Sequence, residues 1–125
     1  MFFKNSYGYN IYYEDFGSKA DTPVVFLHAW GSDHKDFKYP SENLDGYRRI
    51  VYDHRGFGRS DKVNKNMSLR HLANDLKELI EYLNLKDIVL VGYSMGACVV
   101  YKYLEMYGEE NISSVVICDM TAKKI

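Results

Sequence analysis

The sequence predicts an α/β fold, with strands and helices that alternate along the chain. Four short runs are β-branched and almost continuously apolar, which is typical of strands buried on both faces of a parallel sheet. Stretches with helical character separate the last three runs, as right-handed crossovers in such a sheet require. The four runs are residues 23–28 (PVVFLH), 49–53 (RIVYD), 87–92 (DIVLVG) and 114–119 (SVVICD).

An antiparallel hairpin is predicted ahead of these strands. The segments FFK (residues 2–4) and YNIYYEDFG (residues 9–17) flank the short stretch NSYG. Asn, Ser and Gly between two such runs are typical of a hairpin turn. We therefore expect a mostly parallel sheet with flanking helices and an antiparallel hairpin at its N-terminal end.

Two helices are predicted, one on each side of the third buried run. Residues 69–83 carry apolar side chains at spacings of three and four, and Ser68 precedes them as a candidate N-cap. A second helix is expected from Met95 to Tyr107, because Gly108 suits the left-handed residue that ends many helices. The apolar positions of the first helix are Leu69, Leu72, Ala73, Leu76, Leu79, Ile80 and Leu83.

The composition indicates one globular domain. The chain has 125 residues, 46% of them hydrophobic, with no repeat and no linker-like stretch. Its 16 basic and 17 acidic residues are spread without blocks, so neither nucleic acid nor an acidic membrane is an expected partner. The chain lacks the apolar core of a signal peptide and the ~20 apolar residues of a membrane span, so we expect a cytoplasmic protein.

The two cysteines predict no disulfide and no metal site. Cys98 and Cys118 lack CxxC spacing and lie in apolar segments, which favours buried, reduced thiols. No cluster of histidine, cysteine and carboxylate residues has the spacing of metal ligands, so neither a metal nor an organic cofactor is predicted.

Three polar stretches follow the first three buried runs, where their carboxyl ends should meet in a crevice. They are HAWGSD, DHRGFGRSD and GYSMG. GYSMG places Ser94 between Gly92 and Gly96, at a turn from a strand into a helix. A serine at such a turn has a strained backbone and projects into the crevice, while the glycines allow strand and helix to pack closely. The pattern predicts that Ser94 is a catalytic nucleophile; the alternative is a capping serine at an ordinary turn.

A nucleophilic serine needs donors for the oxyanion that forms on the attacked carbonyl. The N–H of Met95 lies at the N-terminus of the second helix, where the helix dipole also favours an anion. The N–H of Trp30, in the loop after the first buried run, is the candidate for the second donor. His28, at the end of that run, is interpreted as a structural residue, because a buried histidine is usually hydrogen-bonded within the core.

DHRGFGRSD is interpreted as a tight structural loop. Asp53 and Arg55 are expected to form pairs or to cap backbone groups, and Gly56 and Gly58 to adopt positive φ. A phosphate-binding loop is the competing function, but the spacing matches neither GxxxxGK[ST] nor GxGxxG. The loop is therefore expected to shape the crevice without performing chemistry.

Taken in this order, FLHAWGS, VYDHRGFGRSD and VGYSMGA resemble the α/β-hydrolase superfamily, and the resemblance covers essentially the whole chain. Within the superfamily the chain looks most like the esterase and cofactor-free haloperoxidase-like group. That group usually has glycine where this chain has Ala29 and Ala97. Serine at position 94 argues against the related haloalkane dehalogenases and epoxide hydrolases, whose nucleophile is an aspartate.

The resemblance implies a catalytic triad in the chain order serine, acid, histidine. All four histidines, His28, His34, His54 and His71, precede Ser94, so none occupies the family's position for the base. Asp119 is a candidate acid, because some branches place the acid after this strand. An approach of His34 or His54 to Ser94 is the alternative for the base. We therefore expect residues 1–125 to form the N-terminal part of one hydrolase core domain, truncated after about the sixth strand.

Three functions follow as hypotheses. The first is a serine hydrolase that acts on a small ester or acyl substrate and lacks its histidine in this chain. The second is a non-catalytic fragment that pairs through its exposed sheet edge with a complementary C-terminal chain or with a copy of itself. The third is perhydrolase or haloperoxidase-like chemistry at the same serine.

Overall fold

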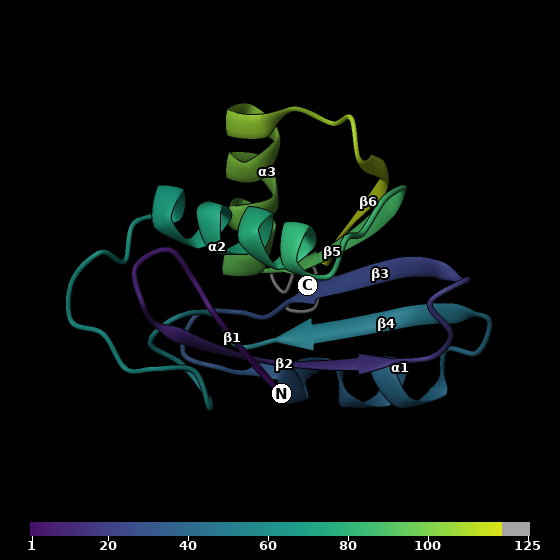
Figure 1. Cartoon of the computed structure of the whole chain (residues 1–125), viewed down its shortest axis with the longest axis horizontal. Coiled ribbons are helices and arrows are strands. Elements are labelled where there is room, and N and C mark those ends of the chain that lie inside the picture. The colour runs from purple at the N-terminus through teal and green to yellow at the C-terminus, as the bar shows by residue number, and fades with distance from the viewer. Residues whose placement is uncertain (119–125) are drawn as a thin grey trace, which may run out of the picture.

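A computed structural model describes residues 1–118 of the chain, and its centre is a six-stranded sheet (Figure 1). The strand order across the sheet is β1-β2-β4-β3-β5-β6. The strands β4, β3, β5 and β6 run parallel, whereas β1 and β2 pair antiparallel with each other and β2 pairs antiparallel with β4. Their bounds are β1 Phe2–Lys4, β2 Asn10–Phe16, β3 Thr22–Leu27, β4 Tyr47–Tyr52, β5 Ile88–Tyr93 and β6 Ile112–Cys118. The predicted hairpin and mostly parallel sheet are both confirmed.

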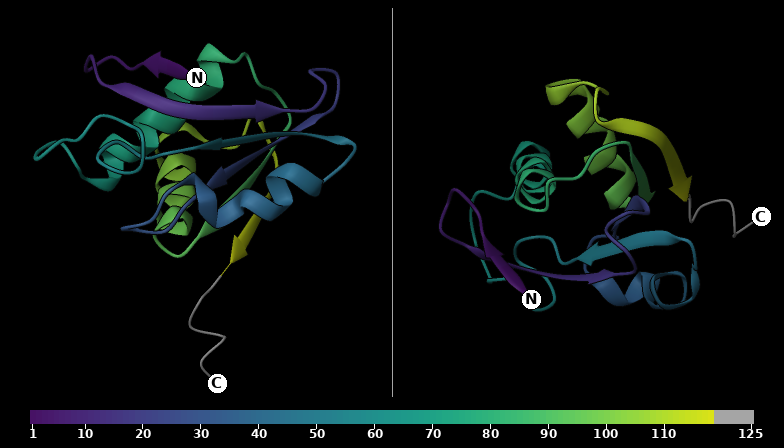
Figure 2. Two further views of the ribbon diagram at one scale, coloured as in Figure 1. Left: turned by 90° about the horizontal axis from the view of Figure 1, so that it is seen from below. Right: turned by 45° about the vertical axis from the view of Figure 1, so that its right-hand side comes forward.

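Helices cover both faces of the sheet (Figures 1 and 2). The helices α2 (Leu69–Tyr82) and α3 (Met95–Tyr107) lie side by side on one face. On the other face lie the short 3-10 helix η1 (His34–Phe37) and α1 (Lys38–Asn43). The larger apolar core therefore lies between the sheet and α2 and α3, and a smaller one lies between the sheet and η1. The smaller core comprises Val24, Phe26, Phe37 and Val51.

The helix ends form where the sequence predicts them. Ser68 caps α2: its Oγ accepts the N–H of His71 at 3.4 Å, and its own N–H donates to Nδ1 of His71 at 3.3 Å. Gly108 ends α3 with φ of 80°, and its N–H donates to the carbonyl of Leu104. Capping of this kind satisfies backbone groups that the helix itself leaves unpaired.

The predicted burial of the cysteine thiols is wrong for Cys98, which is exposed, and Cys118 is only partly buried. The reason is the orientation of α3. Val99, Val100 and Tyr103 fill the side of this helix that faces the core, so the neighbouring position 98 points away from it.

No helix among residues 1–118 is long and apolar enough to cross a membrane.

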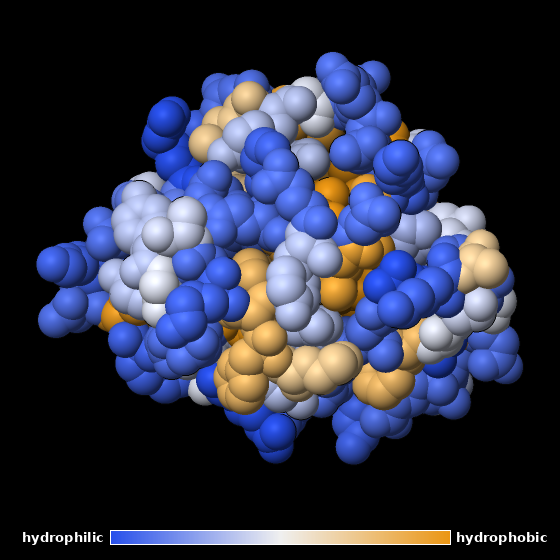
Figure 3. Space-filling model, viewed as in Figure 1, coloured by the Kyte–Doolittle hydropathy of each residue, from blue (hydrophilic) through white to orange (hydrophobic). Residues whose placement is uncertain are grey.

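Strand β6 lies at one edge of the sheet (Figure 2), and some of its apolar residues are exposed. Val116 is 47% exposed and Ile117 is 37% exposed, although every residue of the neighbouring β5 is buried or half-buried. At the opposite edge, Met1 and Phe2 are also exposed, and Figure 3 shows hydrophobic residues among hydrophilic ones on the face nearest the viewer. An edge strand with apolar side chains and unpaired backbone groups is a template for pairing with another strand.

A buried ion pair ties the loop after β4 to helix α2. The fully buried Arg55 guanidinium donates to both oxygens of Asp75 at 2.7 Å, and Asn5 donates to the same carboxylate at 2.8 Å. The ring of Tyr7 lies 4.5 Å from the guanidinium carbon. Burial raises the pKa of Asp75, while the hydrogen bonds from Arg55 oppose this rise. Arg55 therefore pairs with a carboxylate in α2, and not with Asp53 in its own loop.

Replacing Arg55 by methionine should lower the free energy of unfolding by about 3–5 kcal/mol, because it leaves the Asp75 carboxylate buried without its counter-ion. Urea denaturation followed by circular dichroism measures the change. The control is Lys102→Met, which removes the more exposed Lys102–Glu105 pair and should cost less than about 1 kcal/mol. Equal effects of the two substitutions would show that burial does not govern the strength of the Arg55–Asp75 pair.

Candidate active site

The loops after β3, β4 and β5 meet at one edge of the sheet, because these three parallel strands are neighbours in the order β4-β3-β5. The residues concerned are 28–33, 53–61 and 94. In open α/β sheets, ligands bind outside the carboxyl ends of the strands. This edge is therefore the candidate site.

Ser94 occupies the turn between β5 and α3 and is exposed to solvent. Its φ of 56° and ψ of −114° lie outside the regions that residues with a Cβ readily adopt. The turn is held at both ends, because the Ser94 N–H donates to the Cys118 carbonyl at 3.2 Å and its carbonyl accepts the Ala97 N–H at 2.9 Å. Backbone strain of this kind gathers at functional sites, where the surrounding structure must maintain it.

Two glycines let α3 approach the sheet at this turn. A Cβ on Gly96 would lie 2.1 Å from the carbonyl oxygen of Leu27, the last residue of β3. A Cβ on Gly92 would lie 2.7 Å from the Cα of Ala97. Both distances are too short for any side chain, so the first turn of α3 lies directly on the carboxyl end of β3. This contact brings Ser94 next to the loop that begins at His28.

Two backbone N–H groups, one directly after Ser94 and one in the loop after β3, make no hydrogen bond to any of the described residues. One belongs to Met95, the first residue of α3, and the other to Trp30 in the loop after β3. Trp30 is 60% exposed, and its indole packs edge-on against Phe57 with 4.9 Å between ring centroids. A free N–H at a helix N-terminus favours a nearby anion.

His28 is fully buried and forms two hydrogen bonds. Its Nδ1 lies 2.7 Å from the carbonyl oxygen of Ala29, and its Nε2 accepts the backbone N–H of His54 at 3.0 Å. His54 is also fully buried, and its Nε2 lies 3.2 Å from the carbonyl oxygen of His28. Burial lowers the pKa of both imidazoles, so both are neutral at pH 7. Neither ring is hydrogen-bonded to Ser94.

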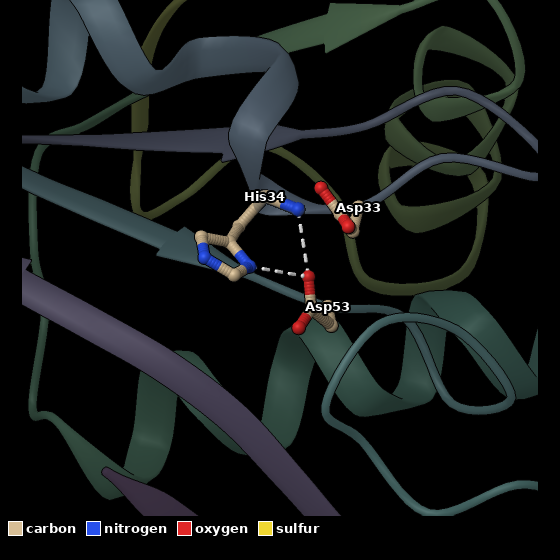
Figure 4. A group of neighbouring side chains, drawn as sticks. All are labelled: Asp33, His34 and Asp53. Carbon is tan, nitrogen blue, oxygen red and sulfur yellow. Dashed lines mark hydrogen bonds and ion pairs between the residues drawn. The ribbon is translucent and has the colours of Figure 1, made fainter.

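Asp53 organises the loop after β4 (Figure 4). Its Oδ1 accepts the backbone N–H of His34 at 2.7 Å and the Nδ1–H of the same residue at 2.8 Å, while Oδ2 accepts the N–H of Arg59 at 2.8 Å. Gly58 adopts φ of 53°, and a Cβ there would lie 2.4 Å from the Asp53 carboxylate. Gly56, with φ of 87°, is the second left-handed glycine of the loop. Asp53 therefore caps backbone groups and pairs with His34.

Asp33, His34 and Asp53 lie close enough to be considered as metal ligands (Figure 4). Most of the side-chain polar atoms of these three residues already form hydrogen bonds, however. Both Asp53 oxygens and His34 Nδ1 serve the hydrogen bonds described above, and the Asp33 side chain accepts the N–H of Lys35 to cap η1. His34 Nδ1 donates its proton to Asp53 and would have to lose this bond to bind a cation, so we assign the cluster to the support of the loops.

None of the four histidines is hydrogen-bonded to Ser94 Oγ among residues 1–118. His34 faces Asp53 and Glu14, and His71 caps α2, while the other two form the buried pair. Asp119, the candidate acid, lies outside the described residues.

Two contacts at this edge of the sheet were not predicted from the sequence: the His28–His54 pair and the bond from His34 to Asp53. Both join loops separated by 19 residues or more, and spacing in the sequence does not reveal such contacts.

Comparison with known proteins identifies the fold family. Residues 22–124 match the family model described as alpha/beta hydrolase fold. The chain belongs to the alpha/beta hydrolase family. The prediction made from the three loop motifs is thus confirmed at the level of family and fold.

Relatives of the chain include esterases and haloperoxidases. An esterase from Exiguobacterium antarcticum superimposes with a TM-score of 0.89 at 38% identity, covering 93% of this chain and 43% of that enzyme. A non-heme haloperoxidase from Rhodococcus erythropolis is 35% identical over 88% of this chain and 40% of its own length. A bifunctional esterase/perhydrolase from Acinetobacter calcoaceticus is 34% identical over 88% of this chain and 41% of its own length. The chain thus spans about two-fifths of the length of these alpha/beta hydrolases.

Gly96→Ala should lower the free energy of unfolding by about 1–3 kcal/mol, because the new methyl group would collide with the Leu27 carbonyl. Alanine normally stabilises a helix interior relative to glycine by about 1 kcal/mol, so the sign of the change is informative. Urea denaturation gives the sign. The exposed Cys98→Ala, on the same helix, is the control and should change stability by less than about 0.5 kcal/mol. A stabilised Gly96→Ala protein would contradict the close contact between α3 and β3.

Proposed function

We propose that the chain carries the nucleophile and the oxyanion-binding groups of a serine hydrolase that acts on carboxylic esters or related acyl substrates. The observation that carries the proposal is the exposed Ser94, held at φ of 56° on the turn between β5 and α3. The esterase and haloperoxidase relatives favour acyl chemistry at this position.

In the proposed reaction, Ser94 Oγ attacks the carbonyl carbon of the ester and its proton passes to a base. The negative charge that develops on the carbonyl oxygen is stabilised by the N–H groups of Met95 and Trp30. Collapse of the tetrahedral intermediate breaks the bond to the alcohol, which leaves with the proton from the base. Water then attacks the Ser94 ester, and the carboxylic acid is released with the serine restored.

The base of this reaction has to come from outside the described residues. Serine is a weak nucleophile without a base within hydrogen-bond reach, and each histidine in residues 1–118 is engaged elsewhere. We propose that a histidine and its partner acid are supplied by a complementary segment of a hydrolase fold that pairs with β6. The exposed Val116 and Ile117 of this edge strand support the pairing. Asp119, just past this strand, stays a candidate for the acid.

Two alternative functions involve Ser94 or the edge strand β6. Perhydrolase chemistry is supported by the name of the Acinetobacter calcoaceticus relative, and it would use peroxide in place of water at the Ser94 ester. Pairing through β6 without catalysis is supported by the exposed edge alone. We also propose a cytoplasmic location, which the free thiols of Cys98 and Cys118 support.

Labelling with a fluorophosphonate probe tests the proposal. The isolated chain should be labelled at Ser94, identified by mass spectrometry, about 10²–10⁴-fold more slowly than the esterase from Exiguobacterium antarcticum, because it lacks the general base. Ser94→Ala should abolish the label. Replacement of the exposed Ser114 by alanine is the control and should leave the rate unchanged.

Two outcomes would contradict the proposal. Labelling at a residue other than Ser94 would show that Ser94 is not the nucleophile. Labelling as fast as that of the full-length esterase would mean that a base within this chain reaches Ser94.

A further inference from the structure

The two histidines beneath the Trp30 loop form a reciprocal pair. Their ring centroids are 4.3 Å apart with the planes inclined at 58°, and both side chains are fully buried. The backbone N–H of His54 donates to His28 Nε2, and His54 Nε2–H donates back to the His28 carbonyl. His54 is therefore hydrogen-bonded both to the ring and to the backbone carbonyl of His28.

These bonds fix the tautomer of His28. Because Nε2 accepts a hydrogen bond from His54, the single proton of the neutral ring must lie on Nδ1. Nδ1–H then donates to the carbonyl oxygen of Ala29 at 2.7 Å. The same oxygen accepts the N–H of Ser32 at 3.2 Å. The Ala29 carbonyl is thus held from two directions.

The carbonyl of Ala29 and the N–H of Trp30 belong to one peptide unit. A trans peptide unit is planar, so its C=O and N–H groups point in opposite directions and cannot turn independently. No cis peptide bond occurs among the described residues. Any bond that fixes the direction of the Ala29 carbonyl therefore fixes the direction of the Trp30 N–H as well.

We propose that His28, itself held by His54, is a positioning residue that aims the Trp30 N–H at the oxyanion site through the shared Ala29–Trp30 peptide unit. The inference rests on the proposed function, which makes this N–H an oxyanion donor. His28 contacts neither Ser94 nor the substrate and acts only through the peptide.

One ring nitrogen of His54 is buried without a hydrogen-bond partner in the described part of the chain, an arrangement that does not stabilise the fold. Its Nδ1 is buried and has no hydrogen-bond partner among the described residues, as expected when Nε2 carries the ring proton. Leaving a buried acceptor unpaired is unfavourable. The ring is nevertheless oriented so that its one N–H reaches the His28 carbonyl, which favours a role in holding His28.

Two substitutions of His28 separate its two bonds. Asparagine places an amide N–H close to the position of Nδ1, so His28→Asn keeps the donor to Ala29 and loses the acceptor for His54. Glutamine places its amide close to the position of Nε2, so His28→Gln keeps the acceptor and loses the donor to Ala29. A role limited to filling the core would make the two variants equivalent.

The first readout is the ¹H–¹⁵N heteronuclear NOE of the Trp30 amide, which reports motion of this peptide unit. The second is the dissociation constant of phenylboronic acid, which forms a tetrahedral adduct with a nucleophilic serine. His28→Asn should keep the NOE of the parent chain and bind the boronate within about threefold. His28→Gln should show a lower NOE and about 10²-fold weaker binding, the effect expected for one lost oxyanion donor. His71→Gln, which alters the cap of α2 and a ring contact with Tyr7 and leaves His28 and His54 unchanged, is the control.

The outcomes are decisive for each part of the account. If the two His28 variants behave alike, whether both lose or both keep the NOE, the positioning role is wrong. If the parent chain binds no boronate while the NOE still separates Asn from Gln, His28 positions the peptide but the proposed function fails. Should His28→Gln not fold, His54→Leu removes the donor to the His28 carbonyl and should lower the Trp30 NOE; an unchanged NOE overturns the inference.

Discussion

The close approach of α3 to the end of β3 is the constraint on which the rest of the site depends. It exists because Gly96 has no side chain where the Leu27 carbonyl lies, and because Gly92 leaves room for the backbone of Ala97. Ser94, the residue before this helix, adopts an unusual backbone conformation with φ of 56° and ψ of −114°. The same contact places the first turn of α3, which begins at Met95, against the backbone of His28 at the start of the loop that carries Trp30. The two glycines therefore account for the tight packing of α3 on the sheet directly after the Ser94 turn.

A second set of contacts keeps the neighbouring loops in place. These contacts are made by buried charged groups. Asp53 is hydrogen-bonded to backbone groups and to His34, and Arg55 is paired with Asp75. Removing such groups from water is unfavourable unless each polar atom finds a partner. These hydrogen bonds thus tie the loops after β3 and β4 to each other and to α2.

Much of this architecture could be predicted from the sequence, because the relevant signals are local. Apolar runs located the strands, Ser68 and Gly108 marked helix ends, and the glycines around Ser94 indicated a tight turn between strand and helix. The buried Asp75 within α2, the exposed Cys98 and the partner of Arg55 could not be predicted in this way. They depend on which side of a helix meets the sheet and on loops that are distant in the sequence. The His28–His54 pair also belongs to this group, since the two residues are 26 positions apart.

The central claim is that Ser94 and the N–H groups of Met95 and Trp30 form one site for a tetrahedral intermediate. A crystal structure of the chain after reaction with a fluorophosphonate measures this directly, since the phosphonyl oxygen stands in for the oxyanion. The account predicts a covalent bond to Ser94 Oγ, with the phosphonyl oxygen about 2.7–3.1 Å from both backbone nitrogens. A phosphonyl oxygen that points into solvent, away from both nitrogens, would contradict it.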